Sequence, residues 1–336
     1  MRTDTHYIEE HNVKRRHIGA LALLAATLFG LPALSAFAQS APPLKLYIGF
    51  AVGGPTDVIG RLIGGEVGQV LKRAVVVENL TGASGNLATM ALIKSPPDGN
   101  TLLVTSLTHN VNTLLIPEQT KYDPINDVVP VSQAVTLFSA LIVPYDSPFR
   151  SVADVVAKAK TASGVTYASA GIGGSGHLAA ELLASRAGGT MVHVPFRGNA
   201  PAMLEVMAGR VDFMFFPMVG LQQMVQTKKL RVLAVTTAER RPDYPDVPTM
   251  AEAGLPGFER YSNYIGFMAP RGTPPSVAAG LHEAIKTAMA KPSVRDQLLA
   301  LGAGPVGSSP QEFASFIVDD RKRWADLITT AKIKAE

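Results

Sequence analysis

LKLYIGFAVGGPTD, residues 44–57, predicts a β-strand, a glycine turn and the start of a helix. Residues 44–50 are apolar except for one lysine, which is typical of a strand buried on both faces. A Gly-Gly-Pro run ends that strand, and Thr56 or Asp57 can cap the helix that follows. A glycine loop that leads into a helix exposes backbone N–H groups at the positive end of the helix dipole, so this stretch favours an anion.

A second stretch of the same kind, TYASAGIGGSGH, lies at residues 166–177. We expect the two glycine loops to face each other across a ligand cleft. The run GIGGSG at 171–176 also satisfies the GxGxxG fingerprint of dinucleotide-binding folds. The acidic partner of that fingerprint is missing, although Arg197 could meet a 2′-phosphate. We therefore expect an anion loop for a small ligand, with an exported NAD(P)-dependent oxidoreductase as the alternative.

The composition indicates a folded, exported protein with two domains. The chain has 336 residues, of which 47% are hydrophobic and 17% charged, so it can bury a large core. The net charge of +4 is spread along the sequence, and no basic tract points to a nucleic-acid partner. There is no cysteine and the histidines are scattered, so we expect neither a metal site nor a cofactor.

The N-terminus predicts a signal peptide over residues 1–38. A basic segment at 14–17 precedes an apolar run at 18–31, which is too short to span a bilayer comfortably. Small residues close the segment, so we expect cleavage after Ala38 and a mature protein in the periplasm. A paired arginine in the basic segment leaves open whether export is by the general secretory or the twin-arginine route.

Strands and helices alternate along the mature chain, which predicts an α/β fold with parallel sheets. The expected strands are 44–50, 74–78, 101–105, 131–138, 140–143, 166–170, 191–195, 211–216, 230–236 and 261–269. The expected helices begin near Asp57 and at 86–94, 151–159, 177–186, 201–208, 221–227, 275–290, 294–301 and 310 to the end. We expect a polar loop at 106–112 and a long surface connection at 240–257. We expect the C-terminal block to have no sheet of its own and to pack back on the first domain.

The alternation predicts two domains. Residues 39–142 form the first part of domain 1, residues 143–264 form domain 2, and residues 265–336 return to domain 1. The chain would cross between the domains near 141–144 and 265–270. Two α/β domains joined by two crossings form a hinged cleft.

Serine and histidine residues in the loops make a serine hydrolase another alternative. Ser84 and Ser175 both miss the G-x-S-x-G pattern, and His177 has no evident acid partner. The helix dipole disfavours charged His177, so we expect it to anchor or donate to a ligand. His109 would lie in a loop, either on the surface or facing the cleft. Asp57 would cap its helix, because a carboxylate repels an anionic ligand.

The chain resembles the Bug receptors, the periplasmic solute-binding proteins of tripartite tricarboxylate transporters. The resemblance covers nearly all of the mature chain and rests on seven ordered blocks. These blocks are GGPTDVIGRLIGGEVGQVL, VVVENLTGASGN, PPDGNTLLVTS, GSGHLAAELL, HVPFRGNAPAMLEVMAGRVDFMF, LRVLAVTTAERRPDYPDVPTMAEAGLPGFE and GFMAPRGTP.

The resemblance implies a type II, Venus-flytrap binding protein without catalytic activity. It implies that loops 50–57 and 170–177 hold a ligand carboxylate, with backbone groups of the glycines and side chains of Thr56, Ser175 and His177 as donors. The loop after the third strand and the HVPFRG turn would shape the rest of the cleft. The expected ligand-binding residues are Phe50, Gly53, Gly54, Pro55, Thr56, Asp57, Thr105, Ser106, Thr108, Ala170, Gly173, Gly174, Ser175, His177, Arg197 and Phe216.

Several positions depart from the pattern of the family. Ala51-Val52 replaces a proline, Thr81 a frequent proline, Ser84 a frequent glycine and Tyr264 a tryptophan. Phe216-Pro217 stands where a polar residue followed by asparagine is common, so the far side of the pocket would be less polar. An apolar wall would leave a second charge unpaired. We therefore expect a monocarboxylate or aromatic carboxylate, rather than a tricarboxylate or an amino acid.

The function expected from the sequence is a monomeric periplasmic receptor that captures a small organic carboxylate. It would deliver this ligand to the membrane subunits of a tripartite tricarboxylate-type transporter. A receptor that reports to a sensor protein, without a transporter, remains an alternative.

Overall fold

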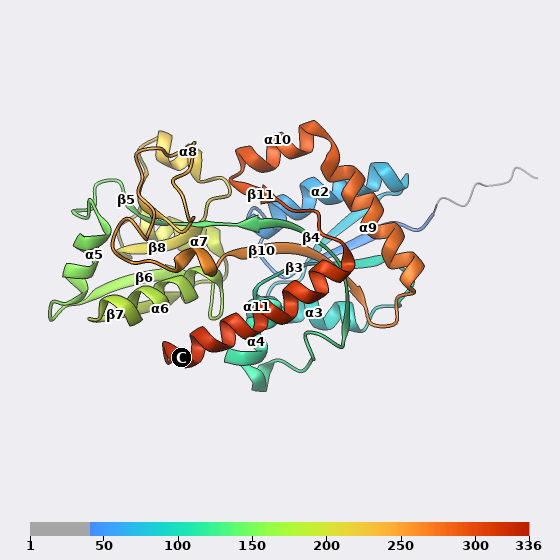
Figure 1. Cartoon of the computed structure of the whole chain (residues 1–336), viewed down its shortest axis with the longest axis horizontal. Helices are drawn as coiled ribbons and strands as arrows, with labels where there is room; N and C mark the ends of the chain where they lie inside the picture. The colour runs from blue at the N-terminus through green and yellow to red at the C-terminus, as the bar shows by residue number, and fades with distance from the viewer. Residues whose placement is uncertain (1–40, 336) are drawn as a thin grey trace, which may run out of the picture. The chain divides into compact units, whose positions relative to one another are not determined.

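Two mixed β-sheets with helices packed around them make up residues 41–335, which this computed structural model describes (Figure 1). The predicted signal peptide and its cleavage after Ala38 lie outside the described residues. Among the described helices, none is both long and apolar enough to cross a membrane.

The first sheet has six strands in the order β11-β4-β10-β3-β1-β2. They are β1 (Leu44–Ile48), β2 (Val75–Asn79), β3 (Thr101–Ser106), β4 (Val128–Leu137), β10 (Asn263–Pro270) and β11 (Ala303–Pro305). β1 lies between β2 and β3 and runs parallel to both. Its Leu44, Leu46 and Ile48 are buried whereas Lys45 is exposed, so burial of this strand on both faces was a wrong expectation.

The second sheet has five strands in the order β7-β6-β8-β5-β9. They are β5 (Ser139–Pro144), β6 (Val165–Ser169), β7 (Met191–Pro195), β8 (Phe213–Pro217) and β9 (Leu230–Val235). β6 is parallel to β7 and β8, whereas β5 is antiparallel to β8 and β9. In the first sheet, β10 is likewise antiparallel to β3 and β4. The prediction of parallel sheets therefore holds for only part of each sheet.

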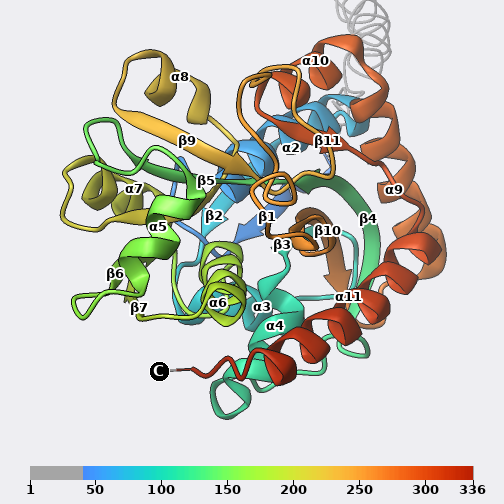
Figure 2. The same cartoon turned by 60° about the vertical axis from the view of Figure 1, so that its left-hand side comes forward.

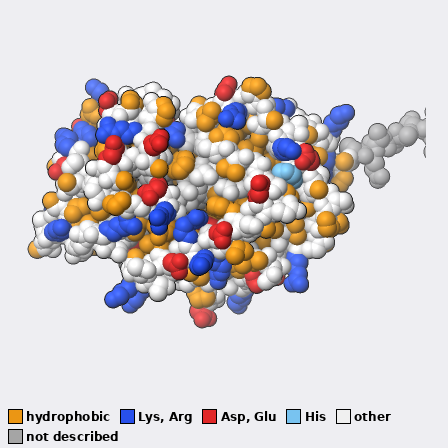
Figure 3. All heavy atoms as spheres, in the orientation of Figure 1, with side chains coloured by type: hydrophobic (Ala, Val, Ile, Leu, Met, Phe, Trp, Pro, Cys, Tyr) orange, Lys and Arg blue, Asp and Glu red, His pale blue; other side chains and the backbone are white. Residues whose placement is uncertain are grey.

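The two sheets define two lobes, which lie side by side in Figure 1. We call residues 42–137 with 263–335 the first lobe, and residues 139–262 the second lobe. The chain leaves the first sheet at Phe138, between β4 and β5, and returns at the start of β10. Both passages therefore lie earlier in the chain than the predicted crossings. Basic and acidic side chains are interspersed on the face that Figure 3 shows.

Helices cover both faces of the first sheet (Figure 2). The helices are α2 (Pro55–Leu71), α3 (Asn86–Ile93), α4 (Thr108–Leu115), α5 (Val152–Ala159), α6 (Ser175–Ala187), α7 (Asn199–Met207), α8 (Leu221–Gln226), α9 (Pro275–Ala290), α10 (Pro292–Ala300) and α11 (Pro310–Thr330). Apolar residues of α2, α9 and α10 share one buried cluster with one face of this sheet. Apolar residues of α3, α4 and α11 contribute to a second cluster, which continues into the second lobe.

Helix α4 occupies the place where the sequence predicted a polar loop at 106–112. Its N-terminus has no side-chain cap, and most of its polar residues are buried. Asn110 of α4 donates from Nδ2 to the carbonyl of Ile317 and to Oδ2 of Asp320, both at 3.0 Å. These partners lie in α11, far along the chain, so no local sequence signal could predict this helix. Strand β11, which lies at the edge of the first sheet, was also missed.

Asp320 is fully buried and joins α4 to α11. Its carboxylate accepts hydrogen bonds from Asn110, from Trp324 Nε1 at 2.9 Å and from Arg323 Nη2 at 2.7 Å. Burial raises the pKa of this carboxyl, and the hydrogen bonds from Asn110 and Arg323 oppose that rise. This contact fixes the C-terminal helix α11 against α4.

Replacing Asp320 by Ala should lower the free energy of unfolding by about 3 kcal/mol, because Asn110 and Trp324 would lose their buried acceptor. Urea denaturation of the variant measures this loss. Asp319→Ala is the matched control, since Asp319 is exposed on the same helix and should change stability by less than about 0.5 kcal/mol. Equal effects of the two substitutions would contradict the role given to Asp320.

Candidate functional site

Two adjoining cavities lie between the lobes. We call the first the helix-end cavity, because the N-terminal turns of α2 and α6 line it together with the start of α4; its volume is about 30 Å³. We call the second the arginine cavity, because Arg197 lines it; its volume is about 320 Å³. Phe50, Ala51, Ala170 and Gly198 line both cavities, so the two are continuous parts of one site.

The helix ends at the first cavity carry no side-chain cap. The N-cap residues are Gly54 for α2 and Gly174 for α6, and both have extended backbone dihedral angles. A glycine N-cap has no side-chain oxygen that could accept from the first-turn N–H groups. The prediction that Thr56 or Asp57 caps α2 is therefore wrong, because α2 begins at Pro55. Both helices present unpaired N–H groups and a positive dipole end at the cavity.

Four hydroxyl groups line the same cavity. Thr56 and Ser175 come from the first turns of α2 and α6, and Ser106 and Thr108 from the end of β3 and the start of α4. The hydroxyls of Ser106 and Thr108 lie 3.1 Å apart and share a hydrogen bond. No Asp or Glu is among the described residues that line either cavity. The lining therefore offers hydrogen-bond donors without a competing negative charge.

Asp57 lines neither cavity, although it lies in the first turn of α2. Its buried carboxylate accepts from Gly53 N at 3.0 Å, from Arg61 Nε at 2.9 Å and from Asn79 Nδ2 at 2.8 Å. Asn79 also donates to the carbonyl of Phe50 at 3.0 Å. The carboxylate thus points away from the ligand side, and its network holds the turn from Phe50 to Gly54 in place.

His177 also lies behind its loop rather than in the cavities. Its Nδ1 accepts from Gly173 N at 3.2 Å, and its ring stacks on His193 with ring centroids 4.3 Å apart. His193 Nε2 lies 2.6 Å from Ser169 Oγ, which accepts from Gly171 N at 3.1 Å. His177 therefore holds the glycine loop at Gly173, and His193 holds it at Gly171 through Ser169.

Burial keeps this histidine pair neutral. Desolvation lowers the pKa of His177 to about 3, with a smaller contribution from neighbouring His193. Desolvation likewise lowers the pKa of His193 to about 4. A neutral His177 can accept the hydrogen bond from Gly173, whereas a protonated one would have to donate at both ring nitrogens.

Other predicted site residues lie in different places. Thr105 borders a small hollow of about 10 Å³ beside the helix-end cavity. Phe216 is buried in the core of the second lobe, and its neighbour Pro217 lines the helix-end cavity instead. His109 is not in a loop: it is buried in α4, stacked on Tyr122, with Nε2 2.7 Å from the carbonyl of Pro124.

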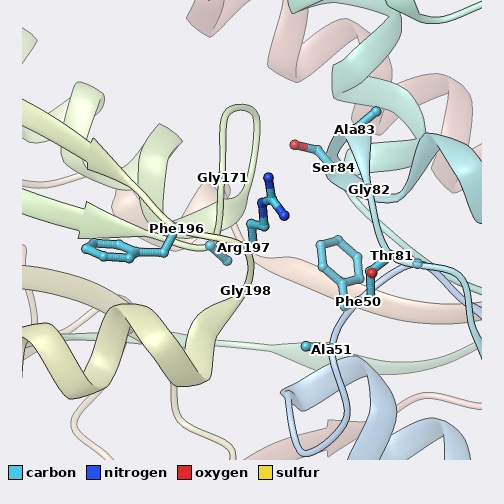
Figure 4. Close-up of a pocket in the computed structure, with 12 residues that line it drawn as sticks. Phe50, Ala51, Thr81, Gly82, Ala83, Ser84, Gly171, Phe196, Arg197 and Gly198 are labelled. Atoms are coloured by element: carbon cyan, nitrogen blue, oxygen red, sulfur yellow. The ribbon is translucent and has the colours of Figure 1, made fainter.

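The loop at 81–84 lines the arginine cavity and was not predicted as part of the site (Figure 4). Ala83 and Ser84 both have positive φ, at 45° and 51°, in the left-handed region that glycine prefers. Ser84 Oγ donates to the carbonyl of Ile172 at 2.7 Å, so it connects the first lobe to the glycine loop of the second. The run of small residues, TGASG, is the sequence signal that could have indicated this loop. Asn199 and Asn263 also line the helix-end cavity without having been predicted.

No group of three or more His, Cys, Asp or Glu residues in the described part of the chain could hold a metal ion.

Comparisons with known proteins identify relatives along nearly the whole chain. The family described as "Tripartite tricarboxylate transporter family receptor" matches residues 59–333. The "UPF0065 protein in tcbD-tcbE intergenic region" of Pseudomonas sp. strain P51 is 38% identical over 326 residues, covering 96% of each chain. The protein BugT of Bordetella pertussis is 32% identical over 324 residues, covering 95% of this chain and 99% of BugT.

Solved structures share the fold. The R. palustris protein Rpa4515 with adipate is 31% identical with a TM-score of 0.83, and the match covers 88% of this chain and 98% of that one. MatC from Rhodopseudomonas palustris with bound malate is 32% identical with a TM-score of 0.79, and covers 86% and 99% of the two chains. The predicted two-lobed binding-protein fold and the resemblance to Bug receptors are thereby confirmed.

The histidine pair predicts acid destabilisation. The pKa of His177 is about 3 in the folded protein and about 6.5 in an unfolded chain, so its stabilising contribution is present above pH 6.5 and is lost as the pH falls towards 3. Between pH 6.5 and pH 5 the wild-type free energy of unfolding should fall by about 2 kcal/mol more than that of His177→Gln. Urea denaturation at the two pH values measures this difference. Parallel decreases in the two proteins would show that His177 is not held neutral.

Proposed function

The chain belongs to the tripartite tricarboxylate transporter family of receptors, and from this premise we propose that it holds a carboxylate of a small organic acid in the helix-end cavity. It acts in the periplasm as a non-catalytic, monomeric receptor, exported with cleavage after Ala38. It releases its ligand to the membrane subunits of a tripartite transporter.

The convergence of two uncapped helix N-termini on one cavity carries this proposal. Gly54 and Gly174 supply no side-chain cap, so the N–H groups of Thr56 and Gly176 are free to donate to a bound anion. Each helix dipole contributes about 0.3–1 kcal/mol to an exposed anion, and more where the lobes exclude water. The hydroxyls of Thr56 and Ser175 add charge-assisted hydrogen bonds to the same carboxylate.

The size of the site suits a small acid. The helix-end cavity accommodates little more than a carboxylate group, so the rest of the ligand extends into the arginine cavity of about 320 Å³. Small-molecule sites commonly have volumes from about 300 Å³ upward. Rpa4515 with adipate and MatC with malate, which share this fold, support a carboxylic acid as the ligand.

Ligand entry requires the lobes to separate. Ser84 Oγ donates to Ile172 O across the cleft, and Phe138 is the one residue between β4 and β5 at the passage from the first lobe to the second. We propose that the lobes rotate about Phe138 and the returning segment before β10, with the domain boundary at Phe138 instead of 142. Opening breaks the bond of Ser84, and the bound carboxylate favours the closed arrangement.

Binding by the mature chain from Gln39 onward tests the proposal. Isothermal titration with small aliphatic and aromatic carboxylates should detect at least one ligand. Ser175→Ala should lower the affinity for that ligand about tenfold, because a hydrogen bond to a charged group is lost. Ser163→Ala is the control, since Ser163 is exposed and lines neither cavity, and it should leave the affinity unchanged. Absence of binding by every carboxylate, or equal effects of the two variants, would refute the proposed site.

A further inference from the structure

Arg197 carries the only charged side chain among the described residues that line the two cavities. It lies between β7 and α7, in the short connection that borders the cleft on the side of the second lobe. Figure 4 shows its guanidinium group projecting into the space between the lobes, towards Phe50 and Ser84. The neighbouring Phe196 ring points away from that space. The connection therefore directs a positive charge, and not an aromatic ring, at the ligand.

The guanidinium group of Arg197 has no hydrogen-bond, ion-pair or aromatic partner in the described part of the chain. Arg260 and Arg295 share this property, but neither lines a cavity of the site. The carboxylate of Asp57, in the loop that faces Arg197 from the first lobe, is already paired with Arg61 at 2.9 Å and lines neither cavity. The charge of Arg197 is therefore available to a ligand.

The backbone around Arg197 is held in position. Phe196 N donates to the carbonyl of Ser169 at 2.9 Å, and the Phe196 side chain packs against the apolar core of the second lobe. Gly198 has a φ of 122°, which a residue with a side chain rarely adopts, and it lies against Ala51 of the first lobe. Because Phe196 and Gly198 are held in place, the Arg197 side chain can reach only a limited region. This favours one position for a ligand group that pairs with it.

We infer that Arg197 binds a second carboxylate, so that the ligand is a small dicarboxylate spanning both cavities. This inference rests on the proposed function, which places the first carboxylate at the ends of α2 and α6. Phe50 lines both cavities and packs against the carbon chain between the two carboxylates. A guanidinium group pairs with a carboxylate through two parallel hydrogen bonds. A third carboxylate would find no cationic partner in the lining, which disfavours a tricarboxylate.

This inference revises the preference for a monocarboxylate that the sequence suggested. That preference assumed an apolar far wall formed by Phe216. The Phe216 side chain is buried among core residues of the second lobe, so it does not form such a wall. The arginine cavity contains Arg197 instead, so a second negative charge of the ligand is paired there with the guanidinium group.

Paired acids of equal length test the inference. Isothermal titration would compare succinate, glutarate, adipate and pimelate with butanoate, pentanoate, hexanoate and heptanoate, which replace one carboxylate by a methyl group. At the chain length that binds best, the dicarboxylate should bind at least about tenfold more tightly than the monocarboxylate of the same length. Arg197→Gln should remove that preference, because it weakens the dicarboxylate much more than the monocarboxylate of the same length. Arg260→Gln, the matched control, should change neither affinity.

The outcomes separate the inference from the proposed function. Equal affinity for the two acids of a pair, or equal weakening of both by Arg197→Gln, would overturn the inference. The proposed function would still stand in that case if Ser175→Ala weakened both acids. If no acid of either series bound, the proposed function would fail and the inference with it.

Discussion

The site depends on backbone N–H groups that glycine N-caps leave free at the starts of α2 and α6. A serine or aspartate in place of Gly54 or Gly174 would satisfy these groups internally and remove the reason for an anion to bind. The order of strands in both sheets brings the two helix ends to one cavity. The hydroxyls of Thr56 and Ser175 then add donors without adding charge.

Charged and titratable groups support the loops from behind. Asp57, which is neutralised by Arg61, holds the turn before α2, whereas the neutral pair His177 and His193 holds the loop before α6. A carboxylate or a positive histidine on the ligand side would alter the charge of the cavity. Placing these groups behind the loops leaves Arg197 as the one charge in the cavity lining of the described chain.

The sequence predicted the features that depend on local signals. Strand, glycine loop and helix start follow one another closely at 44–57 and 166–177, and the structure has both. The direction of side chains was harder to predict. Asp57 and His177 turn away from the cavity because they contact Asn79 and His193, which are distant in the sequence. Helix α4 depends on Asp320, more than 200 residues away, and Phe216 faces the core because of the pleat of β8. Such long-range contacts are absent from any local pattern.

Nuclear magnetic resonance of the backbone amides tests the central claim most directly. Thr56 and Gly176 each hold the second position of an uncapped helix, and both line the helix-end cavity. On titration with a bound carboxylate, the amide protons of both residues should shift downfield together and saturate at the same ligand concentration, since one anion accepts from both helix ends. A ligand that saturates the protein but shifts neither amide, or only one, would contradict the account.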